Sequence, residues 1–167
     1  MSAVIIILIL VNYTSICYQD FKSREVYLAN YISLYLLYIF LFYASELQII
    51  TETILLNTCI VFATVSLLAT YYLLRYRIIA LKKIKSSIGI GDLLIIPVFI
   101  ISFTPFNFIL IYIISLLASL TYFVVAGYYK KEITIPLAGI QSVILAVCLV
   151  LNYTGIVNLH TDIYPLL

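Results

Sequence analysis

Six apolar segments, separated by short polar loops, constrain the fold of this chain more than any other feature. Hydrophobic residues make up 65% of the sequence and the mean hydropathy is +1.21, far above that of an average soluble domain. A membrane helix needs about 20 apolar residues, so 167 residues leave room for about six spans and no sizeable soluble domain. We therefore expect an all-α integral membrane protein, a bundle of about six transmembrane helices that forms one domain over 1–167. The segments run approximately over 3–18, 27–44, 53–74, 93–106, 107–127 and 136–152.

The basic residues are distributed unevenly between the loops. They form three clusters, after the first, third and fifth apolar segments, and the loops around 45–52 and 104–107 contain no Lys or Arg. The positive-inside rule then places the three basic loops in the cytoplasm and both termini outside. The expected location is the cytoplasmic (inner) membrane, as a multi-pass protein. The clusters comprise Lys22, Arg24, Arg75, Arg77, Lys82, Lys83, Lys85, Lys130 and Lys131.

The fourth apolar segment is the weakest predicted span. Its apolar run from Leu93 to Phe103 would give about 16 Å of helix, against roughly 30 Å of hydrocarbon. A re-entrant hairpin is the alternative, but it would place Lys130 and Lys131 outside, contrary to the charge rule. We therefore keep six spans and expect this helix to begin near Ile88, with Asp92 about one turn inside the membrane.

Two aspartates stand at the ends of apolar segments. Asp20 follows the first segment and Asp92 precedes the fourth, so the predicted topology brings both to the cytoplasmic face. An ionised carboxylate beside hydrocarbon is unfavourable, which makes such groups candidates for function. If the two carboxyls meet, like-charge repulsion at low dielectric favours a pair that shares one proton. One carboxylate then activates water for attack on a peptide carbonyl, and the other carboxyl protonates the leaving amine.

The motif Gly89-Ile90-Gly91-Asp92 adds to this interpretation. Glycines without Cβ atoms let a loop bend sharply and let a substrate backbone come close to Asp92. The pattern is short, and its alternative interpretation is a turn followed by a helix start with Asp92 near the N-cap.

These residues together resemble a known family, the type IV prepilin peptidases, which are GxGD-type intramembrane aspartyl proteases. The motif at Gly89 to Asp92 is similar to theirs, and the stretch Asp20 to Val26 resembles their first motif, although Tyr27 and Leu28 stand where Pro and Asn are usual. Pro136, at the opening of the last segment, resembles a third family position. The absence of two cysteine pairs is typical of the short form, without the N-methyltransferase cysteine domain.

The resemblance implies an aspartic-type endopeptidase in which Asp20 and Asp92 are catalytic and no cofactor takes part. The implied partner is a prepilin-like membrane precursor, whose short basic leader ends in Gly and is removed at the cytoplasmic membrane face. The product could serve a pilus, a secretion pseudopilus or another filament.

Four further positions are candidate site residues: Lys22, Arg24, Pro136 and Gln141. Lys22 and Arg24 set the topology, or pair with Asp20 and favour it as the ionised base. Gln141 lies about one turn into the last segment, after Pro136, where it would bind either the substrate or another helix. The basic segment Arg75 to Lys85 suits a surface helix on anionic membrane lipids.

Other function classes have weaker support in the sequence. Cys17, Cys59 and Cys148 lack CxxC spacing and His160 is remote from both aspartates, so we expect no metal site. We also expect no nucleic-acid partner. The alternatives are a small proton- or cation-coupled transporter and a non-catalytic membrane scaffold. A transporter would use a series of acids across the membrane, whereas Asp20 and Asp92 are predicted at one face.

Overall fold

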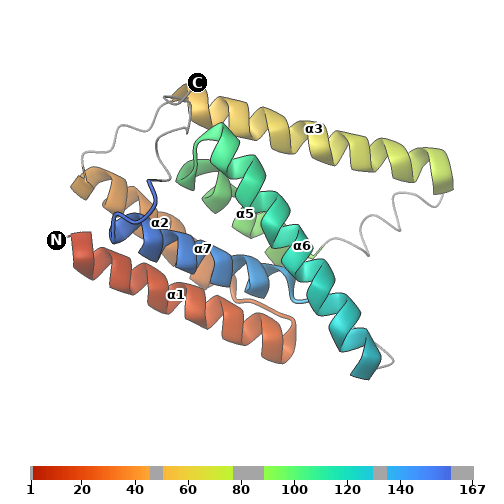
Figure 1. Ribbon diagram of the computed structural model, residues 1–167, viewed down its shortest axis with the longest axis horizontal. Coiled ribbons are helices and arrows are strands. Elements are labelled where there is room, and N and C mark those ends of the chain that lie inside the picture. The colour runs from red at the N-terminus through yellow and green to blue at the C-terminus, as the bar shows by residue number, and fades with distance from the viewer. Residues whose placement is uncertain (1, 46–50, 77–88, 130–134, 159–167) are drawn as a thin grey trace.

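The computed structural model describes residues 2–45, 51–76, 89–129 and 135–158, and this part of the chain is entirely helical (Figure 1). The predicted all-α class and the six helices are confirmed. The helices are α1 (Ser2–Ser23), α2 (Leu28–Ser45), α3 (Thr51–Tyr76), α5 (Ile90–Ser102), α6 (Pro105–Tyr129) and α7 (Leu137–Tyr153).

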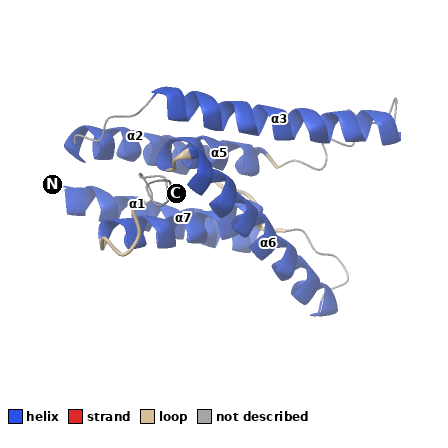
Figure 2. Ribbon diagram, turned by 45° about the horizontal axis from the view of Figure 1, so that its top comes forward, coloured by secondary structure: helices blue, strands red, loops and turns tan. Residues whose placement is uncertain are grey.

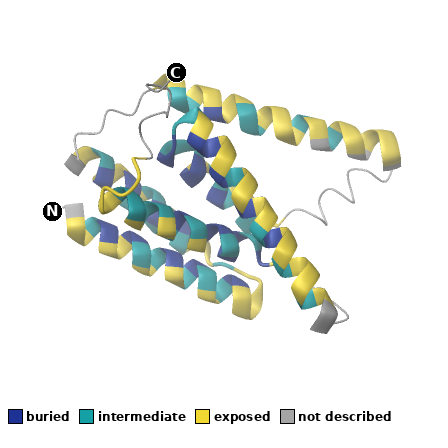
Figure 3. Ribbon diagram, viewed as in Figure 1, coloured by how far each residue is buried: buried dark blue, intermediate teal, exposed yellow. Residues whose placement is uncertain are grey.

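The lengths of the helices and their composition suit a multi-pass membrane protein. Three are long and apolar enough to cross a bilayer: Ala3–Ser23, Thr51–Arg75 and Pro105–Gly127. The other three, α2, α5 and α7, contain shorter apolar stretches. Many large apolar side chains of α3 and α6 lie on the outside, as the exposed faces in Figure 3 show, which is the arrangement expected of helices surrounded by lipid.

Successive helices run in alternating directions. In Figures 1 and 2, α1, α3 and α6 run toward one end of the molecule and α2, α5 and α7 run back from it. As a result, the end of α1, the start of α5 and the start of α7 share one end, which we call the site end. Lys22, Arg24 and Arg75 belong to the same end, the one that the sequence assigns to the cytoplasm.

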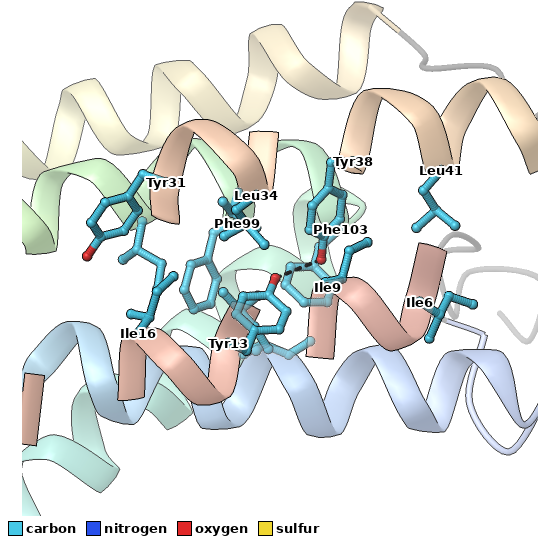
Figure 4. Close-up of a cluster of buried hydrophobic side chains, with 14 of the residues drawn as sticks. Ile6, Ile9, Tyr13, Ile16, Tyr31, Leu34, Tyr38, Leu41, Phe99 and Phe103 are labelled. Atoms are coloured by element: carbon cyan, nitrogen blue, oxygen red, sulfur yellow. Dashed lines mark hydrogen bonds between the residues drawn. The ribbon is translucent and has the colours of Figure 1, made fainter. Parts of the chain in front are cut away.

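The core lies between α1, α2, α5 and α7. The buried residues of α1 and of α2 each recur at intervals of three and four, so each helix presents one continuous stripe to the other (Figure 4). The hydroxyls of Tyr13 and Tyr38, one from each stripe, are hydrogen-bonded at 2.8 Å. The stripes consist of Ile6, Ile9, Tyr13 and Ile16 in α1 and of Tyr31, Leu34, Tyr38 and Leu41 in α2.

Helix α5 is the shortest of the described helices, as its apolar run predicts. It begins at Ile90 and has 13 residues, or about 20 Å of helix, while Ile88 lies outside the described residues. Its end is held by the buried side chain of Asn57 in α3, whose Nδ2 donates to the carbonyl oxygens of Ile100 and Phe103 at 2.9 and 2.8 Å. Asp92 lies in its first turn.

Candidate active site

Asp20 extends the buried stripe of α1 by one further turn. Helix α1 continues to Ser23, beyond the end of the apolar segment, and position 20 follows 16 at the interval that separates the earlier core residues. The Asp20 side chain is therefore turned inward and is only 8% exposed. Its Oδ2 accepts a hydrogen bond of 2.6 Å from the backbone N–H of Gly139 in α7.

Asp92 binds the residue of α7 that directly precedes Gly139. Its Oδ1 accepts a hydrogen bond of 3.2 Å from the backbone N–H of Ala138. The first N–H groups of a helix have no intrahelical partner and carry partial positive charge, so they attract anions. The two carboxylates thus bind consecutive amides in the first turn of α7, and they interact electrostatically with each other.

Two of the five glycines leave the space in which these carboxyls lie, and a third borders the hydroxyl of Tyr31. A Cβ on Gly139 would stand 3.1 Å from Oδ2 of Asp20, and one on Gly89 would stand 3.0 Å from Oδ2 of Asp92. A Cβ on Gly91 would stand 3.2 Å from the hydroxyl oxygen of Tyr31. Gly89 has φ −70° and ψ 140°, which any residue can adopt, so glycine is needed there for space and not for a sharp bend.

A groove of about 1000 Å³ opens beside the two aspartates. Asp20, Arg24, Gly89, Gly91 and Asp92 line its polar side. Apolar side chains of α6 and of the starts of α2 and α7 also line the groove: Leu116, Leu120, Phe123, Leu28 and Leu137.

Of the two basic candidates near Asp20, only Arg24 is placed at the groove. Arg24 has φ 60°, in the left-handed region that bulky residues adopt rarely, and it follows directly on the end of α1. Its N–H donates to the carbonyl oxygen of Asp20 at 3.2 Å, and its charge acts on the Asp20 carboxylate. Lys22 instead donates to the hydroxyl of Tyr18 at 2.9 Å on the exposed face of α1.

The remaining predicted positions differ in their surroundings. Pro136 is buried directly before α7, and its carbonyl oxygen accepts the N–H of Ile140 at 3.0 Å. Gln141 is 1% exposed and packs inside the bundle, not at the groove as the described residues form it. From the basic segment Arg75 to Lys85, the structure describes the side chain of Arg75 alone, which donates to the hydroxyl of Tyr71. Lys130, Lys131 and His160 lie outside the described residues.

Two site features were absent from the sequence interpretation. These are the paired amides of Ala138 and Gly139 and the hydroxyl of Tyr31. The sequence does contain a signal for the paired amides: Pro136 stands at the start of a span and Gly139 follows three residues later. This pattern is typical of a helix N-terminus that another group approaches closely. Within the described ranges, no three His, Cys, Asp or Glu side chains gather into a group that could hold a metal ion.

No protein-family model, curated protein or solved structure matches this chain. The fold and the site by themselves define its class: a multi-pass helical membrane protein that holds two aspartates together at the N-terminus of one helix.

Proposed function

We propose that this protein is an intramembrane aspartyl endopeptidase that removes the leader peptide from type IV pilin-like precursors. The observation that carries the proposal is the convergence of Asp20 and Asp92 on the consecutive amides of Ala138 and Gly139. The two acids are remote in sequence, come from different helices and border one groove. Paired carboxyls in a partly dry environment are suited to share a proton and to act as acid and base.

The reaction uses both carboxyls and one water molecule. The ionised carboxylate removes a proton from water while the water oxygen bonds to the scissile carbonyl carbon, and the protonated carboxyl gives its proton to the carbonyl oxygen. In the resulting gem-diol, one hydroxyl proton returns to the second carboxylate as the C–N bond breaks. The second carboxyl passes this proton to the leaving nitrogen, and the first carboxyl keeps the proton that it took from water. The leader leaves with a new carboxyl group, the mature chain has a new amine, and the pair again holds one proton.

The lining of the groove supports a substrate that is part leader and part membrane helix. Leu116, Leu120 and Phe123 suit the apolar segment of a pilin-like precursor, and the exposed Glu25 at the groove suits its basic leader. In the proposed topology the groove faces the cytoplasm, both termini are outside, and the protein resides in the cytoplasmic membrane. Lys22, Arg24 and Arg75 at the site end support that orientation.

A cleavage assay with a defined precursor tests the proposal. Membranes containing the protein are incubated with a pilin-like precursor whose basic leader ends in Gly, and the products are identified by mass spectrometry. We expect one cut directly after that Gly, and none with Asp20→Asn or Asp92→Asn. Cleavage that survives both substitutions would eliminate the aspartate pair, and proton flux without cleavage would favour a transporter.

A further inference from the structure

Tyr31 places a buried hydroxyl beside the paired aspartates that the mechanism above does not use. It is the first residue of the buried stripe of α2 and its side chain is 0% exposed. In Figure 4 its hydroxyl points past Ile16, away from Leu41 and the rest of the core. That direction follows α1 toward Asp20.

Two observations locate the hydroxyl at the site. The Tyr31 hydroxyl oxygen lies 3.2 Å from the position that a Cβ on Gly91 would occupy. The second glycine of the GxGD motif therefore leaves space next to this hydroxyl. The hydroxyl also interacts electrostatically with both Asp20 and Asp92. It therefore lies close to both acids and comes from a third helix, α2.

The Tyr31 hydroxyl has no hydrogen-bond partner among the described residues, although it is out of contact with solvent. The other buried tyrosines of α1 and α2, Tyr13 and Tyr38, are hydrogen-bonded to each other. The partly buried Tyr35 donates to the carbonyl oxygen of Leu94. A buried donor without a partner destabilises a fold. Tyr31 does not itself line the groove, but Gly91, beside its hydroxyl, does, so a ligand that enters at Gly91 can supply the partner that the hydroxyl lacks.

We propose that the O–H of Tyr31 donates a hydrogen bond to the oxygen of the scissile carbonyl as negative charge develops on it. This inference rests on the proposed function and adds a third catalytic residue to it. The donor is fixed by the core, and it lies in a region of low dielectric, where such a bond is strongest in the transition state. The O–H bond of Tyr31 stays intact throughout, so the proton transfers remain those of the two carboxyls.

The substitution Tyr31→Phe removes the hydroxyl and keeps the ring. We expect kcat for precursor cleavage to fall by about 10²-fold, with KM little changed, because the bond forms fully only in the transition state. Tyr38→Phe is the matched control: it removes a buried hydroxyl from the same helix, at a site bonded to Tyr13 and away from the groove. This control should lower the melting temperature and leave kcat unchanged.

A binding measurement separates catalysis from folding. The probe is a precursor peptide in which a hydroxyethylene group replaces the scissile amide, compared with the cleaved leader product as a ground-state ligand. In Tyr31→Phe the affinity for the hydroxyethylene peptide should fall by the same factor as kcat/KM, while the affinity for the product stays unchanged. Equal losses for both ligands, or a loss of rate that follows only the folded fraction, overturn the role of Tyr31.

The same assay distinguishes the two proposals. If the unsubstituted protein cuts the precursor and Tyr31→Phe cuts it at the same rate, the proposed role of Tyr31 is wrong. The peptidase proposal then still stands. If the unsubstituted protein does not cut the precursor, both proposals fail.

Discussion

At the scale of single residues, space around the carboxyls matters more than backbone flexibility. Gly89 and Gly139 each leave room for one aspartate oxygen, and their missing Cβ atoms would otherwise stand 3.0 and 3.1 Å from it. At these distances an added methyl group requires its neighbours to move by a few tenths of an ångström. An alanine at either position would therefore press on the carboxyl beside it, and at Gly139 also on the ring of Phe21.

We expect Gly89→Ala to lower kcat at least about tenfold, since a displaced catalytic group loses its alignment with the substrate. The added methyl group would press on Oδ2 of Asp92 and move that carboxyl off the amide of Ala138. The initial rate of precursor cleavage measures the effect. Gly127→Ala, at an exposed position in α6, is the control and should keep full activity. Equal rates for both variants would show that the space at Gly89 has no catalytic role.

At the scale of elements, the start of α7 is the part that unites the site. Its first turn offers consecutive free amides, and α1 and α5 each bring one carboxylate to them. Helix α5 is in turn anchored at its other end, where the buried Asn57 of α3 binds two carbonyl oxygens. A short helix is thereby held at both ends, which fixes the position of Asp92.

Replacing Asn57 with Ala should destabilise the protein by about 1–2 kcal/mol, because the carbonyl oxygens of Ile100 and Phe103 lose their donor in a dry region. Thermal unfolding in detergent measures this change as a lower melting temperature. The neighbouring Thr58 is exposed and bonds only within its own helix, to the carbonyl oxygen of Ile54, so Thr58→Ala is the matched control. A melting temperature equal to that of the control would exclude the anchoring role of Asn57.

Features that depend on the local sequence can be predicted from it, whereas features that depend on contacts between distant residues cannot. The helices follow from hydropathy alone, and Asp20 and Asp92 are conspicuous because charges are rare in apolar surroundings. The unpartnered hydroxyl of Tyr31 is different. Its lack of a partner depends on how α2 packs against α1 and α5. In the sequence, nothing distinguishes Tyr31 from the other residues among the 16 tyrosines. The partners of Asp20 and Asp92 at α7 likewise depend on tertiary contacts.

At the scale of the whole molecule, the alternating helix directions put the start of α1 and the end of α7 at the end opposite the site (Figure 1). The last described residues, after α7, lie away from the site end, near the start of α1 (Figure 1). The basic residues Lys22, Arg24 and Arg75 lie at the site end. The proposed orientation therefore has a direct consequence for chemical labelling from the two sides of the membrane.

Single cysteines at the two ends test that orientation, in a variant whose Cys17, Cys59 and Cys148 are replaced by Ala. Val157→Cys, beyond α7, should react with a membrane-impermeant maleimide in intact cells. Ser23→Cys, at the end of α1, should react only after the cells are permeabilised. Labelling of both from the same side, or in the reverse order, would contradict the proposed topology.

The central claim is that Asp20 and Asp92 act as one catalytic unit, and a double-mutant cycle on the rate of precursor cleavage tests it most directly. The variants are Asp20→Asn, Asp92→Asn and the double substitution, each shown to unfold at a temperature similar to the parent protein. We predict that either single change lowers the rate by at least about 10²-fold and that the double variant is no slower than the singles, because neither carboxyl works without the other. A single variant that keeps more than about a tenth of the parent rate, or losses that multiply in the double variant, would contradict the claim.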